Sequence, residues 1–294
     1  MKRLERGYAH RRRLLRRRWL AAIFWLFTGP VLRAHGDLHD QIQAASQQIL
    51  KNPAQGNLYF VRAELHRSHG SFEAAHADYD RAGGLTPGIP GLDFGRGQAF
   101  LQAGKCGEAL KALDRFLKAH PRHVHAHVSR AKAWNLLKNH LAAAEDYTSA
   151  IQCSAQPEPE YYLDRSHAQA AAGPEHFQRA LHGINEGLDR LGEVLTLELR
   201  ALDLEISLKR FGVALDRVER VRRKSVRQEF WLERQGDILH LAGRSAEART
   251  AFCAALEASE SRPPRIRSAK STQELEKRLL LKLNPQNAAP EKGS

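Results

Sequence analysis

The sequence predicts an all-α fold built from stacked helical hairpins, and a fixed spacing of 34 residues carries this prediction. Small residues and turn formers recur at this spacing, first as Ala63, Gly70 and Ala75, then as Gly97, Gly104 and Ala109, then as Ala131, Lys138 and Ala143. A period of this length is typical of helical hairpins, each of which needs its neighbours to bury its apolar face. No segment alternates apolar and polar residues as a strand would, so no sheet is expected.

The spacing divides the middle of the chain into six hairpins. They are expected to begin near Gly56, Pro90, Val124, Pro159, Leu195 and Glu229. Small residues such as Ala63 and Ala75 are expected where two helices cross closely. Gly70 is expected to end the first helix in a left-handed conformation. The fourth and fifth hairpins carry Ser166 and Leu202 at the small-residue position, so they are expected to be irregular or splayed.

This pattern of small residues, turn glycines and closing prolines resembles the tetratricopeptide repeat (TPR) family over residues 56–262. The resemblance implies a right-handed superhelical solenoid of about six hairpins, in which the first helices line a concave groove. It also implies a scaffold that holds a peptide segment or a partner protein in that groove.

The ends of the array are expected to be covered by single helices, because exposed apolar ends reduce solubility. Residues 35–55 are predicted to hold an N-terminal capping helix, and residues 263–283 a C-terminal one. Ser271 to Glu274 matches a capping box that would begin the second of these helices. Residues 284–294 are polar and rich in proline and glycine, and are predicted to be disordered.

Residues 1–34 differ in composition from the rest of the chain. Two groups of three arginines precede a short apolar run from Trp19 to Leu32. That run is shorter than the roughly 20 residues that a spanning helix needs. A basic stretch, a short apolar core and the following Ala34 predict a cleaved signal peptide, and hence a periplasmic or secreted protein without stable membrane insertion. An uncleaved membrane anchor is the alternative.

The positive charge of the chain is concentrated in this leader. The whole chain has a net charge of +13, whereas residues 35–294 carry 36 basic and 32 acidic side chains. A nucleic-acid-binding protein would concentrate basic charge on its folded domain. The balance therefore argues against a nucleic-acid partner.

The candidate partner-binding residues are polar or aromatic side chains on the first helices, at positions that the core does not require. They are Phe60, Arg67, Phe94, Gln98, Lys132, Asn135, Asp203 and Asp237. In the first hairpin, Phe60 and Glu64 occupy the positions at which related chaperone adaptors grip a terminal carboxylate. That mode of binding is therefore not expected.

A periplasmic copper- or zinc-binding protein is the alternative function. Four histidines lie between residues 120 and 127, and His123 and His127 would share one face of a helix. Cleavage after Ala34 would leave His35 at the N-terminus, where its amine and imidazole could chelate copper with help from His39. No cofactor is otherwise indicated, and the sequence has no phosphate-binding loop, GxSxG, HExxH or CxxC motif, so no enzyme is predicted.

Overall fold

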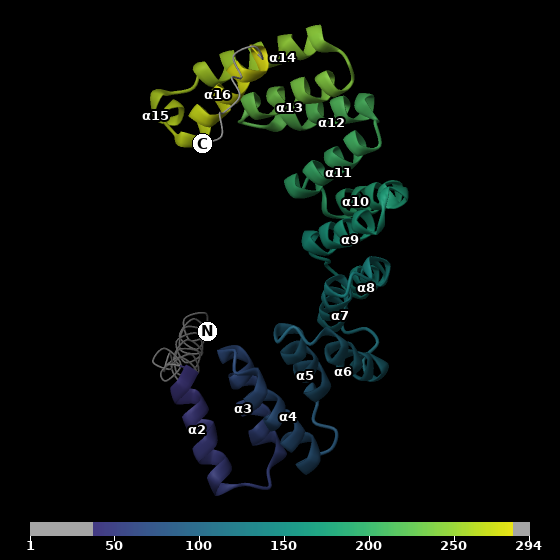
Figure 1. Ribbon diagram of the computed structural model, residues 1–294, viewed down its shortest axis with the longest axis vertical. Helices are drawn as coiled ribbons and strands as arrows, with labels where there is room; N and C mark the ends of the chain where they lie inside the picture. Colours follow the sequence, from purple (N-terminus) through teal and green to yellow (C-terminus); the bar gives the residue numbers. More distant parts are fainter. Residues whose placement is uncertain (1–37, 285–294) are drawn as a thin grey trace, which may run out of the picture. The chain divides into compact units, whose positions relative to one another are not determined.

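The computed structural model describes residues 38–284, and this part of the chain consists of helices and connecting turns without a strand. The helices pair into consecutive hairpins (Figure 1). The all-α prediction is therefore confirmed for the described residues. The predicted leader, residues 1–34, lies outside them, as do residues 285–294 of the predicted tail.

The chain divides into two compact units, the first ending at Ala119 and the second beginning at His120. Within residues 38–119, unit 1 contains one single helix and two hairpins. Its helices are α2 (Leu38–Lys51), α3 (Gly56–His69), α4 (Phe72–Leu85), α5 (Leu92–Gln102) and α6 (Cys106–Ala119). Helix α2 packs against α3, where the Arg62 Nη1 donates a hydrogen bond to Ser46 Oγ at 3.0 Å.

Unit 2 contains four hairpins followed by a short helix and a longer one. Its helices are α7 (Val124–Leu136), α8 (His140–Cys153), α9 (Pro159–Ala172), η2 (Pro174–His176), α10 (Phe177–Leu191), α11 (Leu195–Ser207), α12 (Phe211–Lys224), α13 (Gln228–Leu241), α14 (Ser245–Glu260), α15 (Pro264–Arg267) and α16 (Lys270–Leu283). The second helix of each hairpin packs against the first helix of the next, and α16 packs against α14. Each apolar face is thus buried by its neighbour, as a repeat array requires.

The six hairpins begin at residues 56, 92, 124, 159, 195 and 228, within two residues of the predicted starts. Small residues mark the close crossings. Ala63 and Ala131 are fully buried, and a Cβ atom at Gly97 would lie 2.7 Å from Leu113 Cγ. The buried Leu202 replaces the small residue in hairpin five, where α11 and α12 make the sparsest contact of any hairpin in the described chain.

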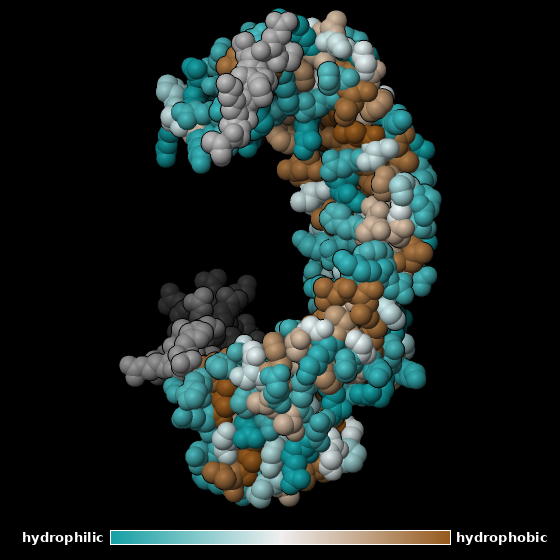
Figure 2. Space-filling model, in the orientation of Figure 1, coloured by the Kyte–Doolittle hydropathy of each residue, from teal (hydrophilic) through white to brown (hydrophobic). Residues whose placement is uncertain are grey.

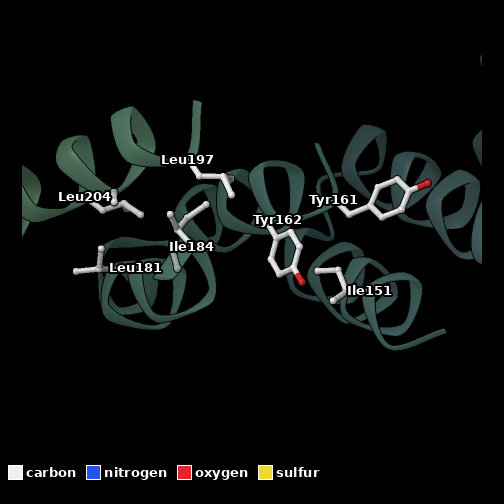
Figure 3. Packing of buried hydrophobic residues seen from close by; sticks show 9 residues of the cluster. Ile151, Tyr161, Tyr162, Leu181, Ile184, Leu197 and Leu204 are labelled. Atoms are coloured by element: carbon white, nitrogen blue, oxygen red, sulfur yellow. The ribbon is translucent and has the colours of Figure 1, made fainter. Parts of the chain in front are cut away.

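One buried cluster of unit 2 extends across three consecutive hairpins, from α8 to α11. Figure 3 shows Ile151 of α8 and Tyr162 of α9 beside Ile184 of α10 and Leu197 of α11. These side chains are at most 1% exposed. Burial of such residues is worth about 1.5–3 kcal/mol each, so stacking, rather than any single hairpin, stabilises the unit.

A left-handed residue stands at the turn of five hairpins. Gly70, Gly104 and Gly243 have φ values of 82°, 74° and 77°, as predicted. The equivalent positions in hairpins three and five hold Lys138 and Lys209, with φ values of 63° and 57°. A side chain in this conformation costs about 1–2 kcal/mol. Hairpin four departs from the rule, because Gly173 has φ 146° and ψ 162° and leads into η2 rather than forming a left-handed turn.

Replacing Lys138 with glycine is expected to raise the free energy of unfolding by about 0.5–1 kcal/mol, because the strain exceeds the entropy that glycine adds to the unfolded chain. Denaturant melts of Lys138→Gly and Lys209→Gly measure this gain. Gly104→Ala is the matched control and should be destabilising. A loss of stability in both lysine variants would contradict the strain.

For the C-terminal helix α16, the buried face agrees with the sequence prediction, but the first residue of the helix does not. Leu275 and Leu279 are buried, as their shared face predicts. The predicted capping box at Ser271 is wrong, because α16 already begins at Lys270 and its N-cap is Ala269. Helix α16 follows the short helix α15 and begins two residues earlier than the capping box predicts. Thr272 therefore lies inside the helix, where it is buried.

Candidate functional site

The candidate groove residues of unit 2 lie on the first helices of three hairpins. Some of these side chains bond to other described residues of the fold, and others do not. Lys132 on α7 and Asp203 on α11 are exposed, and neither has an ion-pair partner within residues 38–284. Asn135 is different, because its Oδ1 lies 3.1 Å from His140 Nδ1 and its side chain also bonds the Tyr147 hydroxyl. Lys132 and Asp203 therefore remain available to a partner.

Arg200 lies on the same helix as Asp203 and was not among the predicted residues. Its Nε and Nη2 donate hydrogen bonds to the hydroxyl and carbonyl of Ser166 on α9, at 2.9 and 3.2 Å. Burial lowers the pKa of Arg200, and burial together with nearby Arg200 lowers the pKa of His167. Helices α9 and α11 are thus joined by a guanidinium that forms no ion pair with any described carboxylate.

Asp237 is engaged within unit 2. Its Oδ1 accepts a hydrogen bond of 2.7 Å from Lys282 Nζ of α16, and the same ammonium donates to Glu233 at 2.9 Å. Arg278 Nη2 bonds the second oxygen of Glu233 at 3.0 Å. Burial alone would raise the pKa of Glu233, but hydrogen bonds from Arg278 and Lys282 hold it below the usual range. These contacts fasten the C-terminal helix to α13, so Asp237 is not free for a partner.

In unit 1, two of the four candidate residues contribute to packing. Phe60 packs on the α3–α4 core, with its ring centroid 6.1 Å from that of Tyr79, and Phe94 lies 5.3 Å from Phe116. The premise that the core does not require these positions is wrong for Phe60. The repeat pattern alone could not reveal this, because an aromatic side chain can turn toward either neighbour.

The other two candidates of unit 1 are Arg67 and Gln98. Arg67 Nη2 bonds Glu64 Oε2 at 2.6 Å, and Glu64 Oε1 accepts from the Tyr79 hydroxyl at 2.5 Å. Burial and this bond raise the pKa of Tyr79. Gln98 is half-buried on α5. Arg67 is therefore held by its own hairpin.

The candidate metal ligands are not brought together in the described part of the chain. His35 lies outside it, and His39 lies 3.1 Å from Gln43. His123 Nδ1 accepts from the backbone of Ala126 and caps α7. His127 has Asp146 Oδ1 at 3.2 Å from one ring nitrogen and the Pro121 carbonyl at 2.9 Å from the other.

Each nitrogen of His127 thus faces an oxygen atom of the protein, which occupies the direction from which a metal ion would bind. Within residues 38–284, no three His, Cys, Asp or Glu side chains form a cluster that could hold a metal ion.

The sequence analysis missed an arginine that recurs at one position of the repeat. In each of the first four hairpins, the residue immediately before the small residue of the first helix is an arginine. These arginines are Arg62, Arg96, Arg130 and Arg165. Arg62 and Arg130 bond Asp78 and Asp146 of the second helix, at 2.7 and 2.6 Å. Arg165 bonds Glu186 at 2.7 Å. Hairpin two has Ala112 at the acidic position, and Arg96 instead bonds Asp80 of the hairpin before.

Hairpin five reverses this arrangement. Arg217 stands on the second helix at the position of Asp146, and its partners Glu198 and Glu205 stand on the first helix. Arg217 and Glu198 are 7% exposed and Glu205 is 1% exposed. The guanidinium also donates to Asn185 at 3.0 Å. Two carboxylates thus share one buried arginine, with Arg220 3.6 Å from Glu198.

The ion pair at Asp146 predicts a pH dependence of stability. Burial would raise the pKa of Asp146, but hydrogen bonds from His127 and Arg130 outweigh it and hold the pKa below its ordinary value. A carboxyl with a depressed pKa stabilises the fold above the unfolded value of about 3.9, and this contribution is lost as the pH falls through the folded value.

Asp146→Asn is therefore expected to cost about 1.5–3 kcal/mol at pH 7, and less than that at pH 3. Denaturant melts at both pH values test this. A cost that stays equal at the two pH values would show that Asp146 acts through packing alone.

Three comparisons place the chain among known proteins. A family model described as tetratricopeptide repeat matches residues 94–157. The C-terminal part of a TPR repeat-containing protein from Cytophaga hutchinsonii is similar in structure, with 12% identity, a TM-score of 0.57, and coverage of 86% of this chain and 92% of that one. A tetratricopeptide repeat protein from Parabacteroides merdae has 18% identity and a TM-score of 0.49, over 83% of this chain and 93% of that one.

No curated protein matches the chain significantly in sequence. In the described range, no helix is both long and apolar enough to cross a bilayer. The family model matches hairpins two and three, and the fold shared with the Cytophaga protein gives the described chain the architecture of a tetratricopeptide repeat array.

Proposed function

We propose that this protein is an exported interaction scaffold, in which the first helices of unit 2 bind a peptide segment of a partner protein. The observation that carries the proposal is the set of charged side chains on α7 and α11 that form no ion pair within residues 38–284. Lys132 and Asp203 are exposed without an ion pair among the described residues, and Arg200 is half-buried with only Ser166 as its hydrogen-bond partner.

These groups suit a polypeptide ligand rather than a reaction. A peptide offers carbonyls and charged side chains along its length, and polar side chains at regular spacing on helix faces can bond them in register. The stacking of α9 on α11 through Arg200 fixes that spacing in advance. A pre-formed surface of this kind binds at a lower entropic cost than a mobile one.

Site-specific photocrosslinking tests the surface. A photoreactive residue at position 132 or 203 is expected to yield an adduct with one partner of defined mass. Gln178, exposed on the second helix α10, is the control position and should yield no such adduct. Equal adducts at all three positions would contradict a first-helix surface.

Charge reversal gives the quantitative prediction. Lys132→Glu and Asp203→Lys are each expected to weaken partner binding by about tenfold through lost charge complementarity. The unfolding midpoint should stay unchanged, because both side chains are exposed. Isothermal titration with the crosslinked partner measures the first quantity and thermal melting the second. Loss of binding only in parallel with loss of fold would contradict the proposal.

Export is supported by residues 1–34, in which a basic stretch precedes a short apolar run. The mass of the protein from the envelope fraction tests it. A chain that begins at His35 is expected. A chain that begins at Met1 would show that the leader is retained and would replace export with anchoring.

A further inference from the structure

The strongest positive run in the described chain lies at the end of α12 and in the turn that follows. Residues 217–227 contain six basic side chains and one acidic one. Arg223, Lys224 and Arg227 are 74%, 59% and 59% exposed at their side chains. Val226, in the same turn, is 83% exposed and is the most exposed large hydrophobic residue described. The exposed end of this run lies next to a pocket that Lys224 and Ser225 help to line.

The pocket lies where α11, α12 and α13 meet and has a volume of about 220 Å³. Leu195, Val221 and Trp231 supply its apolar lining. Trp231 is buried, whereas Leu195 is 55% exposed at the mouth. Figure 2 shows hydrophobic surface over α11–α13 among hydrophilic side chains. The pocket can therefore accept one large aliphatic side chain from outside.

The pocket also carries charges of both signs. Arg220 and Lys224 line it and are paired with Glu198 and Glu193, respectively. Both cations and Glu193 are more than half exposed, and a pair in which both side chains are exposed contributes little to stability. A ligand carboxylate can therefore replace Glu193 as the partner of Lys224 at little cost.

We propose that this pocket and its basic rim form a second docking surface, which binds an acidic peptide segment through one large apolar side chain. The surface goes beyond the proposed function, because its residues come from α12 and from the start of α11 and α13 rather than from the polar face of the first helices. A polyanion without apolar groups fits less well, because it would leave Leu195 and Val221 uncovered.

Fluorescence anisotropy with the full chain provides the test. The probe is a labelled seven-residue peptide of aspartates and glutamates around a central leucine. Binding at low salt is expected to weaken about tenfold when the leucine is replaced by alanine, because the pocket then stays unfilled. The arginine-rich leader is present in every variant, so only differences between variants report on the pocket.

Lys224→Glu and Leu195→Ser are expected to weaken binding of the probe by about tenfold each. Both side chains are more than half exposed, so both variants should remain folded. Lys132→Glu is the matched control and should leave probe binding unchanged, which separates this surface from the first-helix surface. Failure of the first-helix predictions would not alter these results.

Three outcomes would overturn the proposal. The first is equal binding of the leucine and alanine peptides. The second is tighter binding of a single-stranded oligonucleotide of equal charge, with no effect of Leu195→Ser. The third is self-association of the chain that Lys224→Glu abolishes and the peptide does not compete with, which would make a second copy the occupant.

Discussion

Replacing Arg217 with methionine is expected to destabilise the protein by about 3–5 kcal/mol, because removing one partner of a buried ion pair leaves uncompensated charge behind. Two carboxylates are involved here. Glu205 is 1% exposed and Glu198 is 7% exposed, and both bond the one guanidinium. Without the guanidinium, the two carboxylates would lie close together in the protein interior, where water solvates neither of them. Urea denaturation followed by circular dichroism measures the loss.

Two further variants isolate the cause. Combining Arg217→Met with Glu198→Gln and Glu205→Gln is expected to recover more than half of the lost stability, because the unpaired charges are removed with their partner. Arg222→Met removes a pair with Glu219 in which both side chains are about one-third exposed, and should cost less than about 1 kcal/mol. A loss in Arg217→Met no larger than that in Arg222→Met would show that the buried network is not stabilising.

Replacing Tyr162 with alanine is expected to cost about 3–5 kcal/mol, the usual range for removing a fully buried aromatic ring. Tyr162 is 0% exposed, lies with Ile151 and Leu197 in the buried cluster that joins α8 to α11 (Figure 3), and has Arg165 over its ring at 5.3 Å. The loss should appear in thermal melts as well as in urea.

Tyr162→Phe separates the ring from its hydroxyl. That oxygen is buried and has no protein hydrogen-bond partner in the described structure. Removing it is therefore expected to change stability by less than about 0.5 kcal/mol, because no hydrogen bond is lost. A loss comparable to that of Tyr162→Ala would show that the hydroxyl, and not the packing of the ring, carries the stability.

The period predicted the hairpins well because it records a steric requirement that recurs in all of them except hairpin five, which has Leu202 at this position. A helix crossing admits only a small residue, so Ala63, Gly97 and Ala131 fix the register without any further knowledge. Lys138 shows a limit of this reasoning. The turn needs a left-handed residue whatever its identity, and the stacking of neighbouring hairpins imposes that conformation on a lysine.

The candidate site was less predictable, because a helix face shows which side chains point outward but not which neighbours engage them. Lys132 and Asp203 form no ion pair within residues 38–284, whereas Asp237 is bound by Lys282, which lies 45 residues further along the chain. No local spacing reports such a contact. Arg200 was overlooked because the irregular fourth and fifth hairpins hide which of their residues face each other.

The reversed ion pair of hairpin five affects which helices can pair with each other during folding. Helices of similar length and apolar pattern can exchange partners during folding, which is a characteristic error of repeat proteins. If α7 paired with α12, Arg130 would stand opposite Arg217, and if α11 paired with α8, Glu198 and Glu205 would stand opposite Asp146. Each wrong pair would bury like charges. The reversed charges of hairpin five thus make its two helices complementary to each other and repulsive to those of hairpin three. This repulsion discriminates between similar helices before stacking is complete.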